Sequence, residues 1–144
     1  MDHVAIMKKN IGSIEDILSG EKGIESRWMK RRISPYNKVK EGDNIYFKYS
    51  TDKEIITVAK VSSVIQFELN QKKIKEIIEN YGGRRKINLR NKNPLDLYYS
   101  DKKYCVLVLL GDAKRVEPFK ISRKGYGTAW FCVENIDSLR VTTQ

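Results

Sequence analysis

Apolar residues along the chain gather in short runs, where they follow one another or alternate with polar residues. Both patterns are typical of β-strands. A turn at residues 41–43 leads into the second run, and Pro118 requires the end of the fifth to lie on a sheet edge or at a bulge. We predict strands at residues 3–8, 44–50, 54–69, 102–110, 113–121 and 129–136, with the second and third paired and a break near Gly111 and Asp112.

Two other stretches repeat apolar residues at helical spacing. The first begins at Ser13, a residue that caps helices well, and Gly20 follows its last turn. The second spans residues 71–81 and ends before two glycines. We also predict a single helical turn after Pro94, a short closing turn at residues 136–140, and a loop or short helical extension at 84–93.

The number of these elements bounds the fold. A chain of 144 residues buries most of one core but is too short for two ordinary domains. We therefore predict one domain spanning residues 1–144. Five to six strands with two or more helices predict a mainly β fold with helices (α+β), built as a small, closed or nearly closed β-barrel on which the helices pack.

Positive charge is the strongest feature of the composition. The net charge is +10 and the pI is near 9.6, which favours anionic partners, above all nucleic acid. The surplus is concentrated in residues 22–40, 84–92 and 114–124, which hold seven, five and five basic residues against one, none and one acidic residue. Solvated loops would also carry such runs, so this interpretation stays open beside the first.

Composition also argues against several classes of protein. No apolar run approaches the ~20 residues that span a bilayer, and the first residues lack a signal peptide, so we expect a cytoplasmic protein without a membrane partner. Cys105 and Cys132 lie inside apolar runs, and His3 is the only histidine. We therefore expect buried thiols, no metal site and no cofactor.

The stretch GEKGIESRW directly after the first predicted helix carries the candidate chemistry. It fits the pattern G-x-K-x-x-E-x-R with Gly20, Lys22, Glu25 and Arg27. The two cations supply several donors, the carboxylate accepts, the glycine allows a tight turn, and Trp28 adds an aromatic face. A cleft holding these groups would bind a polar ligand. In the alternative interpretation, Glu25 and Arg27 only pair to fix a loop.

This pattern and its surroundings closely resemble the ASCH family, whose members share a PUA-like β-barrel. Besides the motif, a turn of the form K-x-G-D at Lys40, Gly42 and Asp43 enters a strand, as it does in that family. The resemblance extends over nearly the whole chain. It implies a small PUA-like barrel of five to six strands, with the motif lining a cleft proposed to bind RNA or a nucleotide.

Two further stretches are candidates for RNA contact. The segment SRKGYGTAWF interleaves basic and aromatic residues that could hold a phosphate and stack a base. Its alternative role is a turn followed by a strand. Next to the motif, RWMKRRISPYNKV resembles a mobile basic flap suited to phosphate contacts, or else a solvated loop. The binding candidates from the two stretches are Arg123, Lys124, Tyr126 and Trp130, and Arg31 and Arg32.

Two functions from different classes follow from the resemblance. The first, which we favour, is a module that binds RNA or a modified nucleotide. The second is an enzyme, because some members are amidohydrolases that deacylate a modified cytidine with a lysine, a threonine and a glutamate, and relatives have been described as ribonucleases. Lys22 would match that lysine, whereas Glu25 occupies the position of the threonine. If the protein is an enzyme, Lys22 and Glu25 are the candidate catalytic residues. Ser26 is expected to point elsewhere, and Glu76 or Glu79 could act as the acid or base. A third alternative is a basic face that meets an acidic protein.

Overall fold

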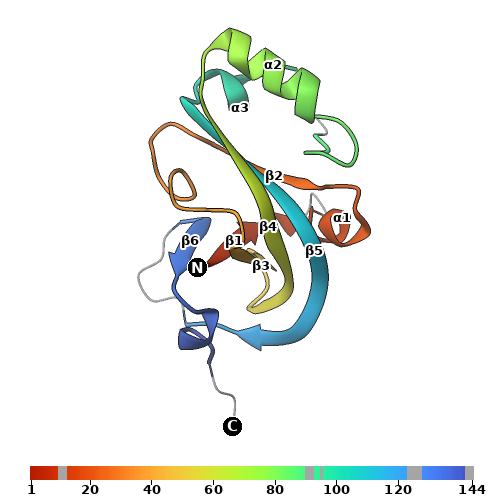
Figure 1. The fold of residues 1–144 in the computed structure, drawn as a ribbon, viewed down its shortest axis with the longest axis vertical. Helices are drawn as coiled ribbons and strands as arrows, with labels where there is room; N and C mark the ends of the chain where they lie inside the picture. Colours follow the sequence, from red (N-terminus) through yellow and green to blue (C-terminus); the bar gives the residue numbers. More distant parts are fainter. Residues whose placement is uncertain (10–12, 90–92, 95, 123–127, 142–144) are drawn as a thin grey trace.

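The strands of this computed structural model form one sheet that curls into a half-barrel (Figure 1). The structure describes residues 1–9, 13–89, 93–94, 96–122 and 128–141. In these residues the strands are β1 (Asp2–Met7), β2 (Ile24–Met29), β3 (Asn44–Tyr49), β4 (Glu54–Glu68), β5 (Tyr104–Lys120) and β6 (Trp130–Val133). They are ordered β2-β5-β4-β3-β1-β6, with β1 parallel to β3 and the other pairs antiparallel. The prediction of a mainly β fold with helices is confirmed.

Strands β4 and β5 form the long, bent antiparallel pair that gives the sheet its curl (Figure 1). The predicted break near Gly111 is wrong, because β5 continues through it as a strand. Asp112 has a φ of 51°, and the register shifts here so that Asp112 and Ala113 face Ala59 alone. Such a bulge bends the strand without ending it. Pro118 is tolerated because this end of β5 pairs with β4 but not with β2.

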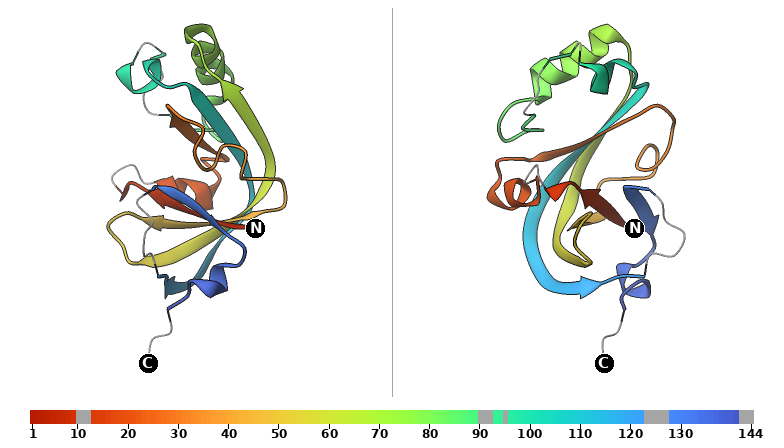
Figure 2. Two further views of the ribbon diagram at one scale, coloured as in Figure 1. Left: turned by 90° about the vertical axis from the view of Figure 1, so that its left-hand side faces the viewer. Right: turned by 180° about the vertical axis from the view of Figure 1, so that it is seen from behind.

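Helical segments flank this sheet in the described part of the chain. They are α1 (Ser13–Ser19), α2 (Gln71–Tyr81), α3 (Leu97–Ser100) and the 3-10 turn η2 (Ile136–Ser138). Figure 2 shows α2 and α3 at one end of the antiparallel pair β4–β5, the end that lies away from the C-terminus. The helix predicted at 71–81 is confirmed with its bounds, and Asn70 caps it by accepting from the Lys73 N–H at 2.8 Å. Within the described residues, no helix is long and apolar enough to cross a membrane.

Strand β5 connects two hydrophobic cores through the alternation of its side chains. Val106 and Val108 belong to the core inside the curled sheet, whereas Cys105 and Leu107 belong to the core beneath α2 and α3. A strand shows successive side chains to opposite faces, so a nearly continuous apolar run serves both. The second core also contains Trp28 of β2. The edge strand β2 is thereby fixed between the barrel and the helical end of the molecule.

Candidate functional site

The G-x-K-x-x-E-x-R motif covers a turn and the start of a strand. Gly20 has a φ of +83°, which favours glycine, and an added Cβ on Gly23 would lie 2.7 Å from the Arg85 carbonyl oxygen. The backbone N–H groups of Gly23 and Ile24 both donate to the Lys86 carbonyl, at 2.9 and 3.0 Å. Glu25 and Arg27 lie on β2, a strand that was not predicted from the sequence, so only the first part of the motif is a loop.

Lys22, Glu25 and Arg27 meet at one point beside β2. The Lys22 Nζ lies 3.3 Å from Glu25 Oε1, and an Arg27 guanidinium nitrogen lies 3.8 Å from Glu25 Oε2. The three side chains are 12, 5 and 19% exposed, so all are largely removed from water. A carboxylate at such a depth requires compensating charge, which the two cations supply. The three charged groups of the motif thus form one buried cluster.

Glu25 keeps one acceptor unused in this cluster. Its Oε2 atom is buried and has no hydrogen-bond partner among the residues that the structure describes. The nearest cation, Arg27, is too far for a hydrogen bond at 3.8 Å. A buried acceptor without a partner costs about 1–3 kcal/mol, and native proteins contain few of them. A ligand that donates a hydrogen bond to Oε2 of Glu25 would remove this cost.

Arg27 bridges the two ends of the curled sheet. Its guanidinium donates to the carbonyl oxygens of Ala129 at 3.4 Å and Ile6 at 3.3 Å, and it lies over the ring of Trp130 at 5.1 Å. These residues belong to or adjoin β1 and β6, whereas Arg27 belongs to β2, the opposite edge of the sheet. Arg27 therefore closes the gap where backbone pairing between the edges is missing in the described part of the chain.

A cavity of about 670 Å³ opens on this cluster. Its volume is within the range of small-molecule sites, about 300–1,000 Å³. Both polar or charged and aliphatic or aromatic residues line it. Besides Lys22, Glu25, Arg27 and Trp28, these are Ile6, Met7, Lys8, Ser13, Asp16, Ser26, Ser50, Ile87, Asn88, Leu89, Tyr98, Tyr99 and Ala129.

Trp28 and Ser26 form part of the wall together. The ring of Trp28 is 8% exposed, meets Tyr99 edge-on at 4.9 Å between centroids, and donates its N–H to Ser26 Oγ at 3.0 Å. Ser26 borders the cavity, but its hydroxyl lies against Trp28, on the face of β2 opposite to Glu25 and Arg27. Burial raises the pKa of Tyr99 to about 12, so its phenol stays protonated at neutral pH. The indole of Trp28 is thus held by a ring contact and a hydrogen bond at this border of the cavity.

Several other predicted site residues do not gather here. Arg31 and Arg32 are exposed beyond the end of β2, where Arg32 pairs with Glu68 at 2.9 Å and does not border the cavity. Arg123, Lys124 and Tyr126 lie outside the described residues. Trp130 requires a correction: its ring is 2% exposed and packed beneath Arg27, so it offers no free face to a base.

Neither acid predicted on the second helix reaches the cavity. Glu76 pairs with Lys73 at 3.0 Å, and Glu79 lies 4.0 Å from Lys75 on the same helix. Neither residue lines the cavity. These carboxylates therefore form pairs along α2. Among the residues that the structure describes, no group of three histidine, cysteine or acidic side chains is placed to hold a metal ion.

Two residues that border the cavity, a carboxylate and an amide, were not predicted from the sequence. Asp16 lies on α1, and its backbone carbonyl accepts from the Lys22 N–H at 3.0 Å. Its side chain accepts from Asn88 Nδ2 at 3.5 Å. Asn88 has a φ of 57°, a conformation in which asparagine is enriched. This left-handed preference was the single local signal available, and nothing in the sequence linked it to the motif.

Comparison with known proteins places the fold but not the chemistry. No protein-family model matches the sequence, and no curated protein matches it. The chain is similar to the crystal structure of ASCH from Zymomonas mobilis, with 21% identity, a TM-score of 0.59, and coverage of 81% of this chain and 71% of that one. A mutant of the same protein gives 21% identity, a TM-score of 0.61, and coverage of 83% and 75%.

A third similar structure is the hypothetical protein PH0355. It is 19% identical, with a TM-score of 0.53, and the match covers 81% of this chain and all of that one. At these identities the likeness concerns the fold, and it confirms the fold expected from the resemblance to the ASCH family. The curled six-stranded sheet with its flanking helices is therefore similar in fold to the ASCH protein from Zymomonas mobilis.

Proposed function

We propose that this protein binds RNA, or a single nucleotide, in the cavity bordered by Lys22, Glu25 and Arg27. The observation that carries the proposal is the unused acceptor of Glu25, buried between two cations. A buried acceptor beside a cavity is stabilised when a ligand donates the missing hydrogen bond. The amino and imino groups of bases and the hydroxyls of ribose are such donors.

The charges of the cavity favour a nucleotide over a bare anion. Lys22 and Arg27 are already opposed by Glu25, and Arg27 also donates to two backbone carbonyls. A phosphate pressed against this cluster would face the Glu25 carboxylate. The apolar wall with Trp28 and Tyr98 suits a flat ring instead. The base or sugar then occupies the cavity, and the basic surface around it contacts phosphates.

Affinity measurements on point variants test this proposal. We expect Glu25→Gln and Lys22→Ala to weaken binding of a short single-stranded RNA at fixed salt, each by about tenfold, the loss of one good hydrogen bond to a charged group. Lys30→Ala is the matched control, because Lys30 is exposed and pairs with Asp101 at the surface. Unchanged affinity in both cavity variants, with folding retained, would contradict the assignment of the site.

Hydrolysis is the second candidate, because Lys22 and Ser26 border the same cavity. A hydroxyl and an amine in one pocket are the groups that an acyl transfer needs. Incubation with an acylated cytidine nucleoside separates the two functions. Product formation that is lost in Lys22→Ala would favour the amidohydrolase, and binding without turnover would favour the module.

A further inference from the structure

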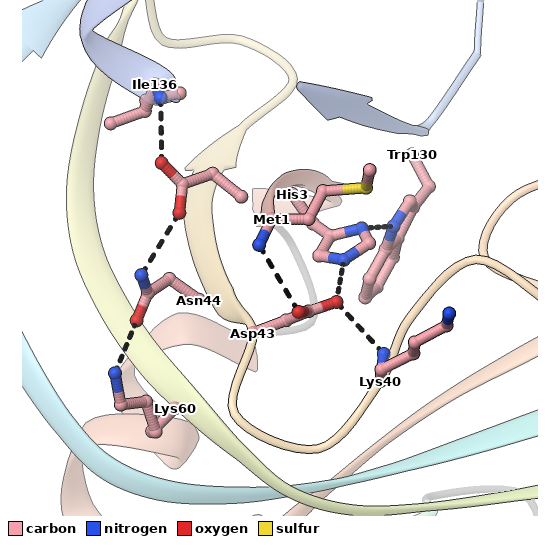
Figure 3. A network of polar contacts seen from close by, with 9 residues as sticks. Met1, His3, Lys40, Asp43, Asn44, Lys60, Trp130 and Ile136 are labelled. Atoms are coloured by element: carbon pink, nitrogen blue, oxygen red, sulfur yellow. Dashed lines mark hydrogen bonds and ion pairs between the residues drawn. The ribbon is translucent and has the colours of Figure 1, made fainter. Parts of the chain in front are cut away.

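His3 joins Asp43 to Trp130 in a network of polar contacts (Figure 3). Its side chain is completely buried, with Nε2 at 2.8 Å from Asp43 Oδ2 and Nδ1 at 3.1 Å from the Trp130 indole nitrogen. Asp43 also accepts from the Lys40 backbone N–H at 2.9 Å. His3 and Trp130 come from β1 and β6, so the network joins neighbouring strands.

These contacts define which form of the imidazole fits. The indole N–H is always a donor, so Nδ1 must accept and carries no proton. Nε2 then carries the proton and donates it to Asp43. A second proton on His3 would set two N–H groups against each other and break the bond to Trp130. Burial lowers the pKa of His3 and outweighs the opposing effect of Asp43, consistent with this geometry.

Trp130 connects His3 with the candidate site. Its ring lies beneath the Arg27 guanidinium at 5.1 Å, within reach of a cation–π contact. The preceding residue, Ala129, supplies one of the two carbonyls that hold Arg27. Arg27 in turn faces Glu25 at 3.8 Å. A continuous series of contacts therefore runs from His3 to the unused acceptor of the cavity.

We propose that His3 and Trp130 are positioning residues for this cavity: neutral His3 fixes the indole, and the indole holds Arg27 in place beside Glu25. Neither His3 nor Trp130 borders the cavity, so both act through Arg27. The consequence is that ligand affinity depends on His3 remaining unprotonated. This inference rests on the proposed function, because the affinity in question is that of the cavity.

The surroundings of His3 contain few groups that could titrate in its place. The charged groups acting on it are Asp43, Asp2 and the N-terminal amino group. From β6, Cys132 is its partner in register, and burial raises the pKa of that thiol. Because the chain has one histidine, an imidazole titration followed from about pH 7 down to pH 5 can only be that of His3.

The test measures affinity against pH by calorimetry. The probe is a single-stranded RNA of about ten nucleotides without a terminal phosphate, so its backbone charge stays constant over the range. For the wild type we expect affinity to fall as the pH drops below the folded-state pKa of His3, by up to about tenfold per pH unit. His3→Gln, which has no titrating ring, should show no such fall.

Trp130→Phe is the decisive variant, because it keeps an aromatic face for Arg27 and removes the indole N–H that donates to His3. We expect its affinity to be independent of pH over the same range. The wild-type pH dependence persisting in Trp130→Phe would overturn the inference. A wild type that binds equally at all these pH values, while circular dichroism shows it folded, would overturn it too.

NMR of the wild type gives a readout that requires neither ligand nor variant. The resonances of the Trp130 indole N–H and the Arg27 side-chain N–H should both shift with the same midpoint as the His3 ring. An Arg27 resonance that stays unchanged while His3 titrates would refute the positioning role. If RNA binds at no pH, the proposed function fails, and this titration alone decides whether His3 controls Arg27.

Discussion

At the scale of single residues, Glu25 depends on Lys22 for charge compensation. Both side chains are largely buried, and their charged atoms are 3.3 Å apart. We expect Lys22→Met to lower the free energy of unfolding by about 1–3 kcal/mol, because a buried acceptor loses its partner. Urea denaturation measures this change. The double variant Lys22→Met with Glu25→Gln should recover part of the loss, since no unpaired charge remains.

A surface pair provides the control for this prediction. Lys30 and Asp101 approach to 2.9 Å, but both side chains are about half exposed or more. Exposed ion pairs contribute little because water and salt screen them. Lys30→Met should therefore leave the urea midpoint nearly unchanged. Equal losses in Lys22→Met and Lys30→Met would mean that burial of the Lys22–Glu25 pair has no energetic consequence.

His3 predicts a specific pH dependence of stability. Its pKa in the folded protein lies below the ordinary 6.5, mainly because burial disfavours the charged ring. Between the two pKa values the unfolded chain binds more protons, so acid favours unfolding. Stability should be fully present above about pH 6.5 and decrease as the pH falls, by at most about 1.4 kcal/mol per pH unit for one proton.

Thermal unfolding from pH 7 to pH 5 measures this effect, with His3→Gln as the comparison. The variant should be less stable at pH 7 and show a flatter profile. A wild-type stability that rises toward pH 5 would contradict the sign of the shift. Asp43 also loses its contribution in acid, because hydrogen bonds from His3 and Lys40 keep its pKa low against the effect of burial, but it does so at lower pH.

The sequence identified three residues of the cavity cluster but not their depth. The spacing of Lys22, Glu25 and Arg27 marked them as candidates, and the structure brings them together. The unused oxygen of Glu25 depends on distances of a few tenths of an ångström, which spacing cannot provide. Trp130 was misinterpreted because an aromatic residue beside basic ones resembles a stacking platform, whereas packing under Arg27 buries it.

At the scale of elements, the turn before β2 places the motif. Gly23 passes close to the Arg85 carbonyl, which an added Cβ would approach to 2.7 Å. Both groups belong to the backbone, so neither can rotate away. We expect Gly23→Ala to lower stability by about 1–3 kcal/mol, the range for forced overpacking. The change in the thermal unfolding midpoint measures it, and the displaced β2 should also lose ligand affinity.

Gly83 is the matched control in the same region. An added Cβ there meets nothing within 4 Å, and its backbone is not in the left-handed region. Gly83→Ala should be neutral or slightly stabilising, because alanine restricts the unfolded chain more than glycine does. A Gly83→Ala variant as unstable as Gly23→Ala would show that the close approach at Gly23 is not the cause.

The sequence pattern predicts some elements more clearly than others. Helix α2 was predicted with its bounds because its isoleucines recur at helical spacing and two glycines follow it. Strand β2 was missed because its burial does not alternate: Ile24 and Glu25 are buried together, as are Trp28 and Met29. A strand that contacts the sheet, a cavity and a helical layer at once cannot show the simple period of two.

At the scale of the whole molecule, Arg27 holds together the open side of the half-barrel. It joins β2 to the carbonyls of Ile6 and Ala129 across the gap between the sheet edges. Lysine keeps the charge but lacks the planar fork that reaches two acceptors. We expect Arg27→Lys to lower stability by about 1–3 kcal/mol and to speed amide hydrogen exchange in β1, β2 and β6.

Arg32→Lys controls for a general effect of exchanging arginine for lysine. Arg32 is exposed and pairs with Glu68 at the surface. Its replacement should change neither stability nor exchange in the edge strands. If Arg27→Lys leaves exchange in β6 unchanged, Arg27 does not close the barrel.

The overall fold could be predicted from the sequence, but most of the cavity lining could not. Counting strands and helices led to a barrel-like fold, and the similar structures confirm it. The cavity, in contrast, collects residues from β1, α1, β2, α3 and the segment after α2, far apart in the sequence. We retain the prediction that residues 1–144 form one domain, since β5 contributes to both main cores.

The most direct measurement is a map of backbone amide shifts when RNA is added to isotope-labelled protein. We predict that the largest changes fall on Lys22, on residues 25–28, on Asn88 and on Ala129, which border the cavity. They should be strongly reduced in Glu25→Gln, whereas Lys30→Ala should retain them. Changes confined to the exposed basic residues of 30–40, with residues 22–28 unaffected, would contradict the assignment of the cavity as the binding site.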